Sequence, residues 1–398
     1  MDGFTKVKDI QLANGSNALR GICITPDGKY IYVSHNLGRF TVPTSQLQQG
    51  WMNTSAFSVI DVDKQEFLGA IVVDEPERGA AGIWSIACND ESVFISHSGT
   101  HEVSVIDHKA MLEKFLNYPN KAVLDYDLTF LYGLRERIPL EGNGPRNMIL
   151  NGDKLIIPTY FADILNIMDI NTNEVTSVEL NPGREETAEN KGERYFNDAS
   201  HCFQNWQSCN GCHPGDARTD GMNWDLMNDG VGNSKNCKSM LFSHMTPPNM
   251  ISGIREHAER AVRAGFNFIQ FFEVSEEDAA CVDAYLKSLR PVPSPYLVNG
   301  ELSDLAKEGQ KVFEKLKCGE CHSGVYYTDM KYHRIGEDIE FEKGWDTPTL
   351  REVWRTAPYL FDGRAATMKE VFSVHKHGIE KKVSEKDIEA LTEYVNSL

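Results

Sequence analysis

Two copies of a short cysteine and histidine motif carry the clearest chemistry in this sequence. Both have the form C-x-x-C-H, and their reactive residues are Cys209, Cys212, His213, Cys318, Cys321 and His322. This motif attaches c-type haem: the two thiols add across the haem vinyl groups, and the adjacent histidine binds the iron from one side. A zinc site or a redox dithiol is an alternative interpretation of a single copy. Two copies, each preceded by a similar helix, favour two covalently bound haem c groups.

The elements around the motifs repeat, which indicates an internal duplication. A Gly-x-x-x-Phe pattern precedes each motif, at 192–196 and at 309–313. Helices are predicted at 275–289 and 384–398, and each begins at the same interval after the first cysteine of its motif. Both helices open with the capping pattern Ser-x-x-Asp. We therefore predict an all-α region of two tandem cytochrome c lobes, at 182–293 and 294–398.

The duplication breaks where a sixth iron ligand is expected in the second lobe. His375 follows Cys318 at the same interval at which Phe266 follows Cys209, and phenylalanine cannot bind iron. We expect His375 to complete the coordination of the second haem, with Met368 and His377 as alternatives. A surface role for His375 is a further alternative.

The first lobe offers a different set of donors. His244 is the best nearby ligand for the first haem, and it also suits a packing role. His201, Met245 and His257 are further options, and an open iron site is another alternative. The sequence therefore predicts two haems that differ from each other.

Residues 1–181 show strand signals instead of helical ones. Three units of paired strands recur, at 26–35 with 57–61, at 93–97 with 103–107, and at 154–160 with 164–169, with an insertion at 109–139 and an entering strand at 5–12. Paired strands at such a period are typical of propeller blades, and these units resemble YVTN-type surface repeats. A closed propeller needs about four to eight blades. We therefore expect residues 1–181 to be an incomplete β-propeller. Removal of N-terminal blades is the favoured explanation, and an open arc of blades is the alternative.

Charge and composition limit the partners. Forty basic and 58 acidic side chains give a net charge of −18, which argues against nucleic acid. The sequence has no apolar run long enough to span a membrane, and its first residues lack a signal peptide. Because haem c is attached outside the bacterial cytoplasm, we expect a periplasmic or cell-surface protein whose export signal is not in this chain.

Residues 190–398 resemble the bacterial di-haem cytochrome c peroxidases and the related enzyme that matures methylamine dehydrogenase. Besides both motifs, the resemblance rests on Thr-Asp-Gly at 219–221, Asp-Thr-Pro-Thr-Leu-Arg at 346–351 and Thr-Ala-Pro-Tyr-Leu-Phe-Asp-Gly-Arg at 356–364. It implies that electrons from a small cytochrome or another redox protein enter at the second haem and reduce hydrogen peroxide at the first. It also implies a bridging calcium, for which Asn236 is the residue most like a family ligand.

The sequence departs from this family at several functional positions. His375 stands where the peroxidases commonly have methionine, which implies a bis-histidine haem of lower potential. The family's tryptophan between the haems is replaced by Ile-Ser-Gly-Ile-Arg at 251–255, so Trp224 is a candidate haem contact and relay, or else a core residue. The family's distal histidine is missing from 227–234. Candidate catalytic groups are His244, His257 and Glu256.

Three functions remain in view. The first is a di-haem peroxidase-like oxidoreductase that reduces hydrogen peroxide. The second is a di-haem electron-transfer protein or substrate oxidase without peroxidase activity. The third is a surface-binding propeller with accessory haem lobes.

Overall fold

The computed structural model describes residues 5–41, 52–226, 234–335 and 342–398. The chain divides into two compact units, the first comprising Met1–Gly211 with Gln270–Glu273 and the second Cys212–Ile269 with Val274–Leu398. This division places residues 182–211 with the N-terminal unit, whereas the sequence predicted a boundary after residue 181. The segment that leads into the first C-x-x-C-H motif is therefore built onto the N-terminal unit.

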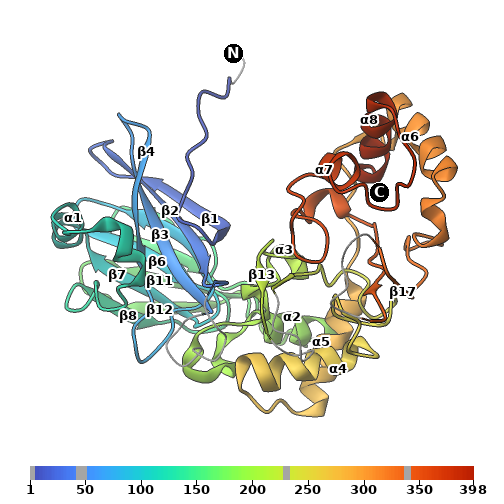
Figure 1. Cartoon of the computed structure of the whole chain (residues 1–398). Coiled ribbons are helices and arrows are strands. Elements are labelled where there is room, and N and C mark those ends of the chain that lie inside the picture. The colour runs from blue at the N-terminus through green and yellow to red at the C-terminus, as the bar shows by residue number, and fades with distance from the viewer. Residues whose placement is uncertain (1–4, 42–51, 227–233, 336–341) are drawn as a thin grey trace. The chain divides into compact units, whose positions relative to one another are not determined.

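The first unit contains three four-stranded antiparallel sheets, each made of consecutive strands (Figure 1). The first sheet comprises β1 (Ser16–Ile24), β2 (Tyr30–Gly38), β3 (Asn53–Asp61) and β4 (Glu66–Val72). The second comprises β5 (Ile83–Cys88), β6 (Ser92–His97), β7 (Glu102–Asp107) and β8 (Arg135–Pro139). The third comprises β9 (Ile149–Asn151), β10 (Lys154–Pro158), β11 (Ile164–Asp169) and β12 (Val175–Glu179).

The strands predicted in the three repeated units are present, and the predicted insertion lies between β7 and β8. It holds α1 (His108–Leu116) and a 3-10 helix at Lys121–Tyr126. The prediction of an entering strand at 5–12 is wrong, because these residues form no strand and β1 begins at Ser16. Val7 is 82% exposed, so the alternating pattern of this segment has no sheet face to pack against.

The middle sheet is buried on both faces. Val93 and Ile95 of β6 belong to the core shared with the first sheet, whereas Phe94 between them belongs to the core shared with the third sheet. Successive side chains of a strand point to opposite faces, so this alternation shows that the sheets stack face to face. Such stacked four-stranded meanders fit the predicted propeller blades. Closure into a propeller stays a prediction.

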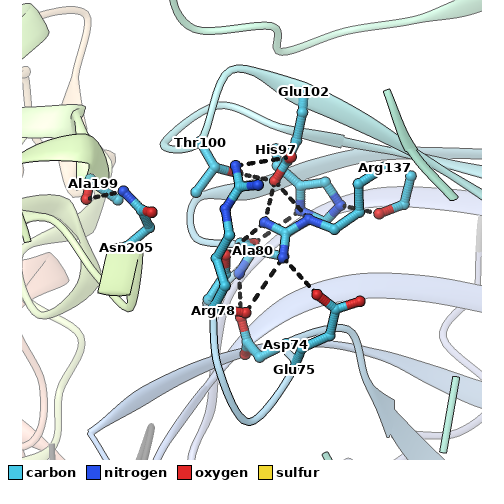
Figure 2. A network of polar contacts seen from close by, with 12 residues as sticks. Asp74, Glu75, Arg78, Ala80, His97, Thr100, Glu102, Arg137, Ala199 and Asn205 are labelled. Carbon is cyan, nitrogen blue, oxygen red and sulfur yellow. Dashed lines mark hydrogen bonds and ion pairs between the residues drawn. The ribbon is translucent and has the colours of Figure 1, made fainter. Parts of the chain in front are cut away.

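A network of charged side chains joins the end of the first sheet to the second sheet (Figure 2). Arg137 of β8 donates from Nη1 to Glu75 at 3.1 Å, from Nε to Glu102 at 3.0 Å, and from Nη2 to the Gly79 carbonyl at 2.6 Å. The side chains of Arg137 and Glu102 are only 9% and 2% exposed. Buried charges of this kind depend on their partners, because water cannot replace a lost one.

A histidine and an aspartate complete this network. Burial lowers the pKa of His97 to about 3, so its ring is neutral and its Nδ1–H donates to the Ala80 carbonyl at 2.9 Å. The Asp74 carboxylate accepts from the backbone N–H groups of Ser55 and Ala80, both at 2.6 Å. Together these bonds fix the segment 74–80 against the second sheet.

The second unit is mainly helical. Together with α2 (Ala188–Asn197) of the first unit, the helices of the motif-bearing region are α3 (Pro214–Ala217), α4 (Ala258–Gly265), α5 (Glu276–Ser288), α6 (Asp304–Lys315), α7 (Met368–Ser373) and α8 (Glu385–Asn396). Two-stranded pairs join them: β13 (Asn223–Trp224) with β14 (Lys235–Asn236), β15 (Leu297–Val298) with β16 (Glu301–Leu302), and β17 (Tyr332–His333) with β18 (Trp345–Asp346). None of the helices in the described ranges is long and apolar enough to cross a membrane.

The predicted helical duplication appears in detail. Ser275 and Ser384 cap α5 and α8, each accepting from the backbone N–H of the aspartate three residues on, at 3.1 Å. Gly309 of the Gly-x-x-x-Phe pattern lies where α6 meets α8. A Cβ there would stand 1.8 Å from the Ala390 carbonyl oxygen, so only glycine permits this approach.

The charged network predicts a specific pattern of stability. Replacing Arg137 by Met leaves Glu75 and Glu102 without their shared cation, and we expect a loss of about 3–5 kcal/mol in the free energy of unfolding of the sheet unit. Urea denaturation followed by the β-sheet circular dichroism signal measures it. The matched control is Arg78→Met, because Arg78 also pairs with Glu102 but its side chain is 50% exposed; its loss should be about 0–1 kcal/mol. Equal losses for the two variants would contradict the assignment.

Candidate haem-attachment sites

The sheet unit holds the chain just before the first motif. The backbone N–H of Gly79 donates to the Gln204 carbonyl at 2.9 Å, and the Gly99 carbonyl accepts from the Ala199 N–H at 2.9 Å. A Cβ on Gly79 would lie 2.4 Å from the Asn205 carbonyl oxygen, so the two backbones touch here. Figure 2 shows that the side-chain amide of Asn205 donates to the backbone carbonyl of Ala199, at 3.2 Å. The charged network therefore positions the entry to Cys209.

Both motifs begin in a short 3-10 turn, at Cys209–Gly211 and at Cys318–Glu320. Burial raises the pKa of Cys209 to about 12 and that of Cys318 to about 11. These thiols are therefore protonated at neutral pH.

The histidines of the two motifs make the same hydrogen bond. Nδ1 of His213 lies 3.0 Å from the Arg218 carbonyl oxygen, and Nδ1 of His322 lies 3.1 Å from the Tyr327 carbonyl oxygen. A carbonyl can only accept, so Nδ1 carries the proton in both rings and Nε2 keeps its lone pair. Burial also lowers the pKa of both rings, which keeps them neutral. His322 is therefore prepared to bind a metal through Nε2. In the first motif the Cys237 sulfur also lies 3.9 Å from Nε2 of His213.

Matching threonines brace the loop after each histidine. The Thr219 hydroxyl donates to the Cys237 carbonyl and the Thr328 hydroxyl to the Thr347 carbonyl, both at 2.6 Å. Each hydroxyl also accepts a backbone N–H two residues on, at 3.0 Å. The thiol pair, the oriented imidazole and the braced loop fit a covalently bound haem c at both motifs.

A second imidazole faces the histidine of the second motif. The ring centres of His322 and His377 are 6.3 Å apart. Burial lowers the pKa of His377 to about 4, so this ring is neutral at neutral pH. Two neutral imidazoles this close to each other would be able to hold a haem iron between them.

The sequence analysis preferred His375 as the sixth ligand and kept His377 as an alternative; the ring spacing supports the alternative, and the identity of the ligand stays a prediction. The chain turns after α7 ends at Ser373, and the backbone N–H of His377 donates to the Val371 carbonyl at 3.1 Å. This turn places the ring of His377 near that of His322. Met368, the other alternative, is buried within the hydrophobic core of the lobe.

The first lobe differs at the corresponding positions. When Cys209 is aligned with Cys318, Phe266 matches His375 and Phe268 matches His377. Phe266 is fully buried. His244, the predicted ligand, instead contacts Asp283 through Nε2 at 2.9 Å and Ser243 through Nδ1 at 3.3 Å. Because both ring nitrogens have protein partners, the structure favours the packing role for His244.

The remaining predicted donors of the first lobe lie elsewhere. His257 and Glu256 are 58% and 68% exposed and contact each other at 3.7 Å, which does not suit a proton donor enclosed in a haem pocket. His201 stacks on Tyr195, with ring centres 4.5 Å apart, and its Nε2 lies 3.6 Å from Asp198. The predicted absence of a distal histidine concerns 227–234, most of which lies outside the described residues.

Trp224 and Asn236 occupy the pair β13 and β14. The indole N–H of Trp224 donates to Asp220 at 2.9 Å, and Trp224 is buried, as the core alternative predicted. Asn236 donates from its amide to the Pro358 carbonyl at 2.5 Å, and its buried Oδ1 has no hydrogen-bond partner. That oxygen is of the kind calcium prefers, but calcium stays a prediction.

Sequence reasoning missed a buried ion pair between the lobes. The guanidinium of Arg218 meets Glu352 through Nε at 2.7 Å and Nη2 at 2.9 Å, with side chains only 4% and 1% exposed. The carbonyl of the same Arg218 orients His213. The first histidine is therefore fixed through a contact with the second lobe. The only sequence signal for this ion pair was an arginine five residues after the histidine of the first motif.

Comparison with known proteins gives partial matches. No family model matches this sequence. The chain is 27% identical to hydrazine synthase subunit gamma of Kuenenia stuttgartiensis over 272 residues, covering 52% of this chain and 76% of that protein. It is 24% identical to hydrazine synthase subunit beta of the same organism over 154 residues, covering 37% of this chain and 39% of that protein. The chain thus spans well under half of the beta subunit.

Solved structures show weaker likeness. A structure of Kuenenia stuttgartiensis hydrazine synthase pressurised with xenon has a TM-score of 0.49 at 23% identity, covering 55% of this chain and 89% of that one. The di-haem peroxidase BthA of Burkholderia thailandensis has a TM-score of 0.44 at 13% identity, covering 55% of this chain and 87% of that one.

The position of the sixth ligand can be tested by paired variants. We expect His377→Ala to convert the haem of the second motif, about half of the total haem, from the low-spin to the high-spin form. The reason is that the iron loses one axial ligand. His375→Ala is the control and should leave the visible and resonance Raman spectra unchanged. A spectral change in His375→Ala, with none in His377→Ala, would reverse the assignment.

Proposed function

We propose that this chain is a di-haem c-type oxidoreductase in which the second haem relays electrons and the first haem is the reaction site. The observation that carries the proposal is the asymmetry between the lobes. His377 stands opposite His322 at 6.3 Å between ring centres, whereas phenylalanines occupy the matching positions of the first lobe. When bound, the haems supply one-electron transfer and, at an open iron, a position for a small molecule.

Different residues of the chain attach the haems, orient the histidines and leave the first site open. Cys209 and Cys212 anchor the first haem, and Cys318 and Cys321 the second. Arg218 and Tyr327 hold the Nδ1 protons of His213 and His322, so both rings present Nε2 to the iron. The residue that matches His377 in the first lobe is Phe268, which is 66% exposed and offers no iron ligand, so the first site is open to a substrate in this proposal.

Similarity to two subunits of one enzyme supports a more specific role. We propose that this chain joins in one polypeptide counterparts of hydrazine synthase subunits gamma and beta, with the haem lobes corresponding to gamma and the stacked sheets to beta. The substrates are then small nitrogen compounds, the product is hydrazine, and the redox partner is another protein of the assembly. The proposed location is the periplasm or cell surface, where haem c is attached.

Reduction of hydrogen peroxide remains the other candidate, as the sequence resemblance implied. Its candidate proton donors, Glu256 and His257, are exposed, and His244 is paired with Asp283. These contacts give no support to the three side chains as the proton donor of peroxide reduction.

Ligand uptake tests the open and closed sites directly. The full chain is matured in a periplasm, its content of two haems is confirmed, and the reduced protein is titrated with carbon monoxide. We expect one carbon monoxide per chain in the wild type, because His377 blocks the second iron, and two in His377→Ala. His375→Ala should still bind one. Uptake of none by the wild type would leave a pure electron carrier, and uptake of two would show that His377 is no ligand.

The two candidate chemistries are separated on the same protein. Hydroxylamine and ammonia combine to hydrazine and water without added electrons, so hydrazine is measured after mixing them with the holoprotein. Hydrogen peroxide consumption is measured in parallel with a reduced electron donor. We expect hydrazine formation and slow peroxide turnover. Rapid peroxide turnover without hydrazine would support the peroxidase instead.

A further inference from the structure

Two cysteines outside the haem motifs lie against each other in the sheet unit. Cys23 belongs to β1 of the first sheet and Cys88 to β5 of the second. Their sulfurs are 3.6 Å apart, which is van der Waals contact. Both side chains are partly buried and pack against the core that the first two sheets share.

We propose that Cys23 and Cys88 form a disulfide that joins the first sheet to the second. The bond has a length of about 2 Å, so the two sulfurs must approach each other by about 1.5 Å to form it. Both cysteines lie on edge strands, since β1 and β5 are each the first strand of their sheet. A covalent link here fixes the spacing of two neighbouring sheets where no backbone ladder joins them.

The chemistry requires an oxidant, and the compartment supplies one. The proposal rests on the export that haem c attachment implies, since disulfides persist outside the cytoplasm. The oxidant is a protein disulfide of the thiol-oxidase class. One thiolate of the pair attacks a sulfur of that disulfide, which forms a mixed disulfide and releases one donor thiolate. The second thiolate then attacks the mixed disulfide and releases the other, so two protons and two electrons leave the pair.

Thiol mapping of the mature protein tests the proposal. The full chain is purified from a periplasm, its haem content is read from the absorption spectrum, and it is unfolded in N-ethylmaleimide without reductant. Trypsin then releases Cys23 in peptide 21–29, Cys88 in peptide 79–109 and Cys281 in peptide 264–287. We expect peptides 21–29 and 79–109 joined, lighter by two hydrogens than their sum, with Cys281 alkylated as the internal control.

The variants make the result specific. Cys23→Ser should leave Cys88 fully alkylated, and Cys281→Ser should leave the joined peptides intact. Alkylation of both Cys23 and Cys88 in wild-type protein that carries two haems would overturn this inference and leave the haem function standing. Joined peptides in a chain without haem would support the disulfide and count against the proposed function.

Discussion

The hydrogen bond from each motif histidine to a backbone carbonyl five residues later is the constraint on which the motif region depends. It fixes the tautomer, because a carbonyl can only accept, and it fixes the ring plane, because the loop that carries the carbonyl is itself held by Thr219 or Thr328. The bond recurs in the two lobes with nearly the same length, 3.0 Å in the first and 3.1 Å in the second. A covalently attached haem requires a histidine ring whose orientation is fixed before the iron binds, and both lobes contain such a histidine.

The two residues that supply these backbone carbonyls, Arg218 and Tyr327, are held in place by different side-chain contacts. Tyr327 places its hydroxyl 3.1 Å from that of Tyr394, on α8 of its own lobe. Arg218 instead pairs with Glu352 of the second lobe, in a contact that is nearly inaccessible to water. The orientation of His213 therefore depends on a correctly folded second lobe, whereas that of His322 is set locally. This difference fits the proposed roles, in which the second haem relays electrons and the first haem is the reaction site.

Much of this architecture was predictable from the sequence. The helix caps at Ser275 and Ser384 and the paired strands follow local patterns, and the structure has them where the patterns indicated. Haem attachment at the motifs follows from the same kind of pattern and stays a prediction. The contact between the rings of His322 and His377 was not predictable, because it depends on how the chain turns after α7. The pairing of His244 with Asp283, and of Arg218 with Glu352, joins residues far apart in sequence. Such contacts leave no local periodicity that a single sequence can reveal.

The central claim is that one haem is closed by His377 and the other is open. Low-temperature electron paramagnetic resonance of the oxidised full chain, with the spins of each species counted, tests it most directly. The account predicts one low-spin signal typical of bis-histidine ligation and one high-spin signal, in equal amounts per chain. Two low-spin haems of equal intensity would contradict it, because a second strong ligand would then occupy the first site.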